Sequence, residues 1–281
     1  MLAPREGAAK RGKAVLSCSI FVINLREADE RRSRILAHLT TLGLEEVVVV
    51  EAIRGDVLAP EERRRRADDV RSVSRYGRAL TPGELGCAMS HARAYDLFLG
   101  GQEAFALILE DDAVLLPDVR SLLGTEELLR WMAHPVPRLL LMTPIRAFME
   151  RGAQPFVGAY RLVKVRRAWE GYGYLVNRAA ARAMLALNSP AWLSADDWVA
   201  YSRLGGVEVS GLDPFCIGYL KTAPSQLEHD RRRAETRMGR ARTFRARMEK
   251  WGRQIMDALY YRPVYGLTQH RMPESWPDKR A

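Results

Sequence analysis

A short apolar segment that ends in three consecutive carboxylates is the feature that most restricts how this 281-residue chain can fold. Residues 105–109 are predicted to form a strand, and Glu110, Asp111 and Asp112 follow it before the chain turns apolar again. In open α/β sheets, ligands bind at the carboxyl ends of strands. The acids are therefore expected to face a ligand, with Glu110 and Asp112 on one side of an extended chain and Asp111 on the other.

Adjacent carboxylates repel one another unless a cation or a hydrogen-bond donor lies between them. Their hard oxygen atoms suit Mg²⁺ or Mn²⁺, and either ion would in turn bind a diphosphate. A plain alternative is an acidic loop that merely ends the strand. The pattern by itself leaves both interpretations open.

The segments around these acids alternate between strand-like and helix-like patterns. Thr81, Pro82 and Glu84 form a capping-box signature, which predicts a helix that begins there and runs to about residue 99. Further strands are expected at 15–24, 46–52, 139–142, 162–165 and 172–176, and further helices at 26–42 and 178–187. This alternation predicts an α/β fold with a mostly parallel sheet flanked by helices.

The chain is expected to have three parts: a leader at 1–14, a domain at 15–230 and a basic tail at 231–281. The basic and apolar N-terminal residues resemble a signal peptide, but they lead directly into a helix pattern and are interpreted as the first strand. Cys18, Cys87 and Cys216 are far apart and form no Cys-x-x-Cys pair, which argues against a zinc site or a disulfide framework. Reduced thiols in the cytosol are the simpler interpretation.

The tail carries most of the chain's net charge of +10, because residues 231–253 hold ten basic residues and two acidic ones. Its apolar residues recur in steps of three and four at Met238, Ala241, Phe244, Met248, Trp251, Ile255 and Leu259. Residues 231–259 are therefore predicted to form a basic amphipathic helix suited to an anionic membrane surface, peripherally on the inner face of the cell membrane. A helix packed on the domain is the alternative. Nucleic acid is not expected as a partner, since no stacking aromatic residues accompany the charge.

Several motifs, taken together and in order, resemble glycosyltransferase family 25, which includes bacterial lipooligosaccharide galactosyltransferases and the catalytic domains of collagen galactosyltransferases. The matching segments are 21–25 with 30–32, 83–91 (GELGCAMSH), 109–112 (LEDD), 174–181, 194–198 (SADDW) and 228–231, so that the resemblance covers about 15–231. One departure is Trp169-Glu170-Gly171-Tyr172, at a place where bacterial members often carry Gly-Thr. Substrate specificity therefore does not transfer with the resemblance.

The resemblance implies a nucleotide-diphospho-sugar transferase fold of the GT-A-like type, with a metal-dependent donor site and inversion at the anomeric carbon. It assigns the metal to Asp112 and Glu110, completed by His229, and the donor to Asn24, Arg31, Arg32, Ser90, His91, Glu110 and Asp111. It assigns the base to Asp196, with Asp197 as the second candidate. Without it, His91 would be a buried core histidine, Arg31 and Arg32 surface charges, and the paired aspartates acids at a helix N-terminus.

These roles fit the chemistry of sugar transfer. A divalent ion neutralises charge on the leaving diphosphate, and a base takes the proton of the acceptor hydroxyl. The expected activity is transfer of a sugar, galactose from UDP-galactose, to a lipid-linked glycan in cell-surface polysaccharide synthesis. The alternatives are a nucleotidyltransferase, for which a glycine-rich phosphate loop is missing, and a catalytically silent membrane-bound scaffold, against which the intact acids argue.

Overall fold

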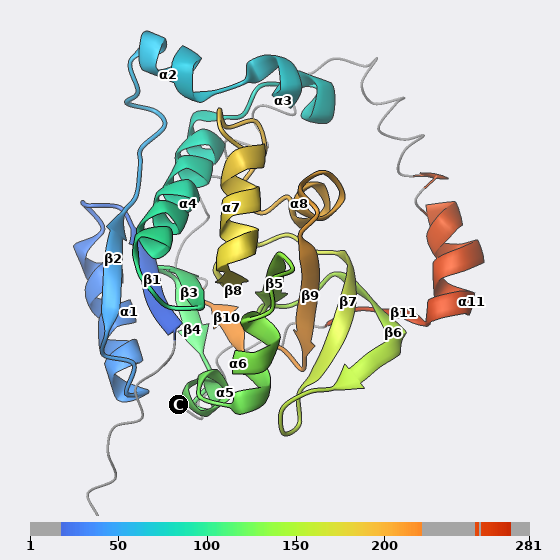
Figure 1. Ribbon diagram of the computed structural model, residues 1–281. Helices are drawn as coiled ribbons and strands as arrows, with labels where there is room; N and C mark the ends of the chain where they lie inside the picture. Colours follow the sequence, from blue (N-terminus) through green and yellow to red (C-terminus); the bar gives the residue numbers. More distant parts are fainter. Residues whose placement is uncertain (1–17, 221–250, 253, 271–281) are drawn as a thin grey trace, which may run out of the picture.

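The computed structural model describes residues 18–220, 251–252 and 254–270, and its centre is a nine-stranded sheet with helices on both faces (Figure 1). The strands are β1 (Cys18–Asn24), β2 (Val47–Glu51), β3 (Phe105–Glu110), β5 (Arg138–Leu141), β6 (Ala147–Pro155), β7 (Arg161–Arg167), β8 (Gly173–Asn177), β9 (Glu208–Asp213) and β11 (Leu267–Thr268). Their order is β11-β6-β7-β9-β5-β8-β3-β1-β2. The expected α/β class is confirmed.

The sheet is mixed, which corrects the expectation of a mostly parallel one. Parallel pairing is confined to β2-β1-β3 and to β5-β9, whereas β8 runs antiparallel between β3 and β5. A parallel neighbour requires a crossover, usually through a helix. Among the described elements no helix separates β5 from β8, and β6 and β7 form an antiparallel pair in that interval. The chain therefore returns to the sheet centre in the opposite direction.

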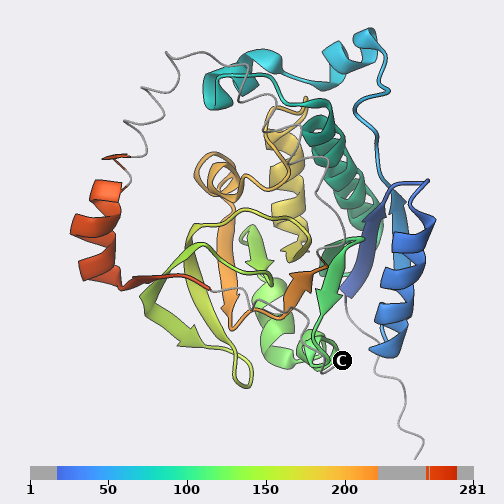
Figure 2. The same ribbon diagram turned by 180° about the vertical axis from the view of Figure 1, so that it is seen from behind.

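Helices cover the two faces of the sheet with separate apolar cores. One face carries α4 (Pro82–Gly100), α7 (Arg178–Leu187) and α8 (Trp198–Gly205), and the other carries α1 (Asp29–Thr41), α5 (Val119–Leu123), α6 (Glu126–Met132) and the small sheet of β4 (Ala113–Leu115) and β10 (Ile217–Tyr219). Alternate residues of β1 divide between the cores: Phe21 packs with Tyr95 of α4, and Val22 with Leu39 of α1. Figure 2 shows the same arrangement from behind. β1 and β3 are thus buried on both faces.

The charged segment between β2 and α4 contains two helices. They are α2 (Pro60–Arg66) and α3 (Asp69–Tyr76), which lie beyond the N-terminal end of α4 (Figure 1). The arginine run on α2 makes exposed ion pairs, as a solvated helix face would, with Arg66 bonded to Glu62 and Arg63 to Asp69.

The described end of the chain packs against the edge of the sheet formed by β6 and β7. A π-helical turn at Asp257–Tyr261 leads into α11 (Arg262–Tyr265), and β11 pairs with β6. Asp257 is buried, with a carboxylate oxygen 3.1 Å from Nη2 of Arg167. Of the predicted tail helix, residues 231–250 lie outside the described residues, and the three-part division stays a prediction. In the described part of that predicted face, Trp251, Ile255 and Leu259 are 66%, 51% and 75% exposed.

Candidate active site

The three acids lie at the carboxyl ends of the parallel strands, beside the end of β1. Asn24, the last residue of β1, donates from Nδ2 to Oδ2 of Asp111 at 2.7 Å, and Arg31 Nη1 lies 3.2 Å from the other Asp111 oxygen. Both oxygens of this buried carboxylate therefore have a donor. Residues 111 and 112 form a turn, so the side-chain alternation expected of an extended chain does not apply there.

Asp112 is the least satisfied of the three acids. Its Oδ1 is buried and has no hydrogen-bond partner among the described residues. Burial, and then the neighbouring Glu110 and Asp111 carboxylates, raise the pKa of Asp112 to about 7, against the opposing effect of Arg31. A divalent cation would give the buried Asp112 oxygen a positively charged partner. The carboxylate oxygens here therefore fit Mg²⁺ or Mn²⁺. His229, the expected further ligand, lies outside the described residues.

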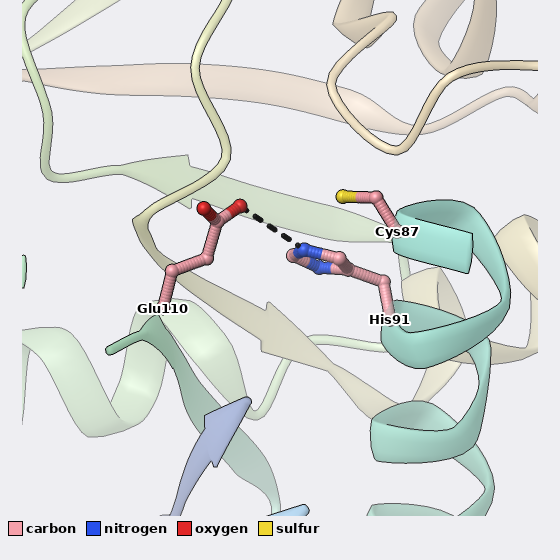
Figure 3. Close-up of side chains that lie close together, drawn as sticks. All are labelled: Cys87, His91 and Glu110. Atoms are coloured by element: carbon pink, nitrogen blue, oxygen red, sulfur yellow. Dashed lines mark hydrogen bonds and ion pairs between the residues drawn. The ribbon is translucent and has the colours of Figure 1, made fainter. Parts of the chain in front are cut away.

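His91 connects the acids to α4. Its Nε2 lies 3.4 Å from Oε1 of Glu110, and its Nδ1 lies 2.8 Å from the hydroxyl of Tyr174 on β8. Cys87, one helical turn earlier, presents its sulfur on the same side of the helix (Figure 3). The histidine is buried, as in the plain interpretation, and it faces Glu110 of the acid cluster. Its contact with a donor stays a prediction.

The small residues of the same motif hold α4 in place. Ser90 donates to the carbonyl of Gly86 at 2.6 Å and accepts from the backbone N–H of Ile53 at 2.7 Å. A Cβ at Gly86 would lie 2.3 Å from the Ile53 carbonyl oxygen, so only glycine permits this approach of the loop after β2. These contacts give Ser90 a positioning role, and a direct contact between Ser90 and a donor stays a prediction.

Arg31 and Arg32, the two arginines of α1 assigned to the donor, differ in their surroundings. Arg31 reaches Asp111, whereas Arg32 pairs with Asp29 of its own helix at the protein surface. Of these two arginines, Arg31 is therefore the one that the fold brings to the acid cluster.

The two consecutive aspartates before α8 also have different surroundings. Asp197 is buried, receives hydrogen bonds from Arg75 at 2.5 and 2.7 Å and from the Tyr76 hydroxyl at 2.7 Å, and caps α8 through the N–H of Ala200. This is the helix N-terminus arrangement that the pattern alone had indicated. Asp197 thus joins α3 to α8, and its contacts argue for a structural role.

Asp196 lies on the other side, with the acids. A side chain at Gly171 would extend between Glu110, His91 and Asp196, because its Cβ would be 3.5 Å from Oε1, 3.6 Å from Cε1 and 3.8 Å from Cβ of those residues in turn. The backbone N–H of Glu170 donates to Oδ2 of Asp196 at 3.3 Å. Asp196, the first candidate for the base, therefore lies near Glu110, one of the predicted metal ligands.

Glu170 is a site residue that the sequence analysis missed. It has a φ of 86°, in the left-handed region that a non-glycine residue occupies at a cost. Its carboxylate accepts from the Tyr172 hydroxyl at 3.1 Å and lies 3.8 Å from Arg146. Burial is the main cause that raises the pKa of Glu170 above its ordinary value, and the Asp196 and Glu110 carboxylates add to it. One feature of the sequence could have indicated Glu170: it is an acid within residues 169–172, where the chain departs from the family pattern.

Fold and site together define an α/β protein with a cluster of acids at the strand ends. The model of glycosyltransferase family 25, described as an LPS biosynthesis protein, matches residues 18–199. The match extends over more than half of the chain, and the chain belongs to this family.

Named relatives share shorter segments with this chain. A glycosyltransferase 25 family member of Anopheles gambiae is 31% identical over 106 residues, 36% of this chain and 17% of the relative. Procollagen galactosyltransferase 2 of Mus musculus and of Homo sapiens is 33% identical over 98 residues, 33% of this chain and 15% of the relative. The matched segments thus make up less than a fifth of these relatives.

One solved structure aligns with a larger share of the chain, but at a low level of similarity. Mannose-1-phosphate geranyltransferase from Thermus thermophilus aligns with 69% of this chain and 73% of its own, at 12% identity and a TM-score of 0.31. That likeness carries no functional information. The described part of this chain contains no helix with the length and apolar character that crossing a bilayer requires.

The different surroundings of the two aspartates predict different effects on stability. Asp197→Asn should lower the free energy of unfolding by roughly 3 kcal/mol, because it leaves Arg75 without its buried counter-charge. Asp196→Asn should change it by less than about 1 kcal/mol. Urea denaturation of both variants measures the difference, and equal losses would show that Asp197 is not the structural member of the pair.

Proposed function

We propose that the protein is a metal-dependent inverting transferase that moves galactose from UDP-galactose to a hydroxyl of a lipid-linked glycan in cell-surface polysaccharide synthesis. The observation that carries the proposal is the buried Asp112 Oδ1, which has no hydrogen-bond partner among the described residues and is close enough to the Glu110 and Asp111 carboxylates for them to raise its pKa. The family's description and the relatives named as galactosyltransferases support the choice of pathway and sugar. A panel of nucleotide sugars with Mn²⁺, followed by donor hydrolysis, tests the donor directly.

Glu110 and Asp112 would hold the metal, with His229 as a predicted third ligand. When bound, a divalent ion neutralises the negative charge of the leaving diphosphate. Asp111 has a different task, since Asn24 and Arg31 hold both of its oxygens and fix the turn that carries Asp112. The Arg31 side chain is 42% exposed, which leaves it accessible to a phosphate group as well.

Asp196 would act as the base that takes the proton from the acceptor hydroxyl. The Glu170 N–H orients one of its oxygens, and the bonds around Asp197 hold the backbone on its other side. Glu170 and Arg146 offer an acceptor and a donor of hydrogen bonds beside the base, a combination that suits the hydroxyl groups of a sugar acceptor. The buried acids favour this interpretation over a silent scaffold.

The membrane surface is proposed as the location of the acceptor. Trp251, Ile255 and Leu259 recur at helical spacing, and all three are exposed. They lie at and just beyond the end of the strongly basic stretch 231–253. Apolar side chains beside dense positive charge match an anionic lipid surface, where each well-placed basic residue contributes about 1 kcal/mol.

Asp112→Ala should abolish Mn²⁺-dependent transfer and remove Mn²⁺ binding measured by calorimetry, because the ion loses a carboxylate ligand. The exposed acid Asp56 provides a matched control, and Asp56→Ala should retain both properties. The metal assignment is wrong if Asp112→Ala stays active, or if chelator leaves the wild type unaffected.

Asp196→Asn should reduce kcat by about 10²–10⁴-fold while donor binding is largely kept, since the amide preserves size but cannot accept the proton. Steady-state kinetics with donor titration measures both quantities. A folded Asp197→Asn variant that shows this loss, beside an active Asp196→Asn variant, would reverse the assignment.

Binding to vesicles should increase with anionic lipid content and decrease with salt. Ile255→Glu with Leu259→Glu should weaken it, whereas Val70→Glu, a charge added at an apolar residue that is 82% exposed on α3, should have less effect. Sedimentation with vesicles of defined composition is the measurement. Equal effects of the two sets of changes, or no binding at low salt, would contradict a lipid-binding face.

A further inference from the structure

The side chains of Cys87, His91 and Glu110 converge in a way that the acid cluster does not require. Their nearest ligand atoms, one from each residue, all lie within 4.8 Å of one another. Cys87 and His91 are four residues apart on α4 and so lie on the same helix face, and Glu110 meets them from the end of β3 (Figure 3). We propose that these three residues form a zinc site.

The ligand types favour zinc over magnesium or manganese. A thiolate and an imidazole are borderline-soft donors that bind Zn²⁺ well, whereas Mg²⁺ and Mn²⁺ prefer oxygen atoms. Three protein ligands with a fourth position for water or another group are typical of accessible zinc sites. Cys87 is only partly buried, which allows an ion to enter and the thiol proton to leave to solvent on binding.

The distances need little adjustment. Zinc lies about 2.0–2.1 Å from nitrogen or oxygen and about 2.3 Å from sulfur, so that tetrahedral ligands lie roughly 3.3–3.7 Å apart. The separation of His91 Nε2 and Glu110 Oε1 is already 3.4 Å. The pairs that include the thiol must close by about 1 Å at most.

A second observation is the support behind His91. Its Nδ1 lies 2.8 Å from the Tyr174 hydroxyl, which also forms a hydrogen bond with the Tyr95 hydroxyl. Tyr174 can donate to Tyr95 and accept from Nδ1–H, which places the lone pair of the imidazole on Nε2, on the side of Glu110. Such a partner fixes the orientation of a metal-binding histidine ring, and in this hydrogen-bond arrangement it leaves Nε2 as the ligand atom.

The site was not foreseen from the cysteine pattern, because the usual paired spacing of zinc ligands is missing. Here the fold supplies the third ligand from a strand 19 residues beyond His91. Glu110 would then be shared with the metal site proposed for transfer. Zinc should consequently inhibit transfer, a consequence that rests on the proposed function, whereas zinc binding itself does not.

The test is titration of the purified full chain with Zn²⁺, and with Co²⁺ as a spectroscopic substitute. We expect one tightly bound ion per chain and a thiolate-to-cobalt charge-transfer band. Cys87→Ser should remove the band and weaken zinc binding strongly, whereas Cys18→Ser, a change at a buried free cysteine elsewhere, should leave both unchanged. Tyr174→Phe should keep the band but weaken binding by about 10–100-fold, because the imidazole loses its partner.

Circular dichroism and thermal melting separate misfolding from ligand loss. Unchanged zinc affinity in a folded Cys87→Ser variant, or cobalt bound without a thiolate band, overturns the proposal. If zinc binds as expected but no sugar transfer exists for it to inhibit, the proposed function fails and the zinc site stands.

Discussion

Repulsion among Glu110, Asp111 and Asp112 is the constraint on which the site depends. A buried central strand brings three carboxylates together, and the protein gives both oxygens of one of them, Asp111, a donor through Asn24 and Arg31. Glu110 is contacted by His91, and one oxygen of Asp112 remains buried without a partner among the described residues. Leaving such a group uncompensated costs stability, so its retention is best understood as preparation for a cation.

Helix α4 fixes the position of His91 beside the acids. Its N-terminus is fixed by the capping box of Thr81 and Glu84, and Gly86 allows the loop after β2 to approach the backbone closely. One turn later, His91 is held between Glu110 and the Tyr174 hydroxyl. The eleven residues 81–91 thus carry a cap, a close contact and a side chain of the site.

Local patterns predicted the elements that build this centre. Strand β3 with its acids, the capping box and the helix at Arg178–Leu187 were all found where the periodicity placed them. The antiparallel position of β8 was missed because strand direction depends on the connections between strands. Glu170 was missed because its importance follows from burial beside Asp196 and from a left-handed φ, and neither property has a local signature.

The ion pair between Arg75 and Asp197 could not be predicted from local sequence either. It also gives a role to the charged segment that contains α3. The two residues are 122 positions apart, and the sequence around either of them does not indicate that they form an ion pair. Asp197 is fixed from three sides, by Arg75, by Tyr76 and by the N-terminus of α8. Its rigidity constrains the preceding residue, so that Asp196 faces Gly171. The charged segment that contains α3 therefore braces the loop that carries the proposed base.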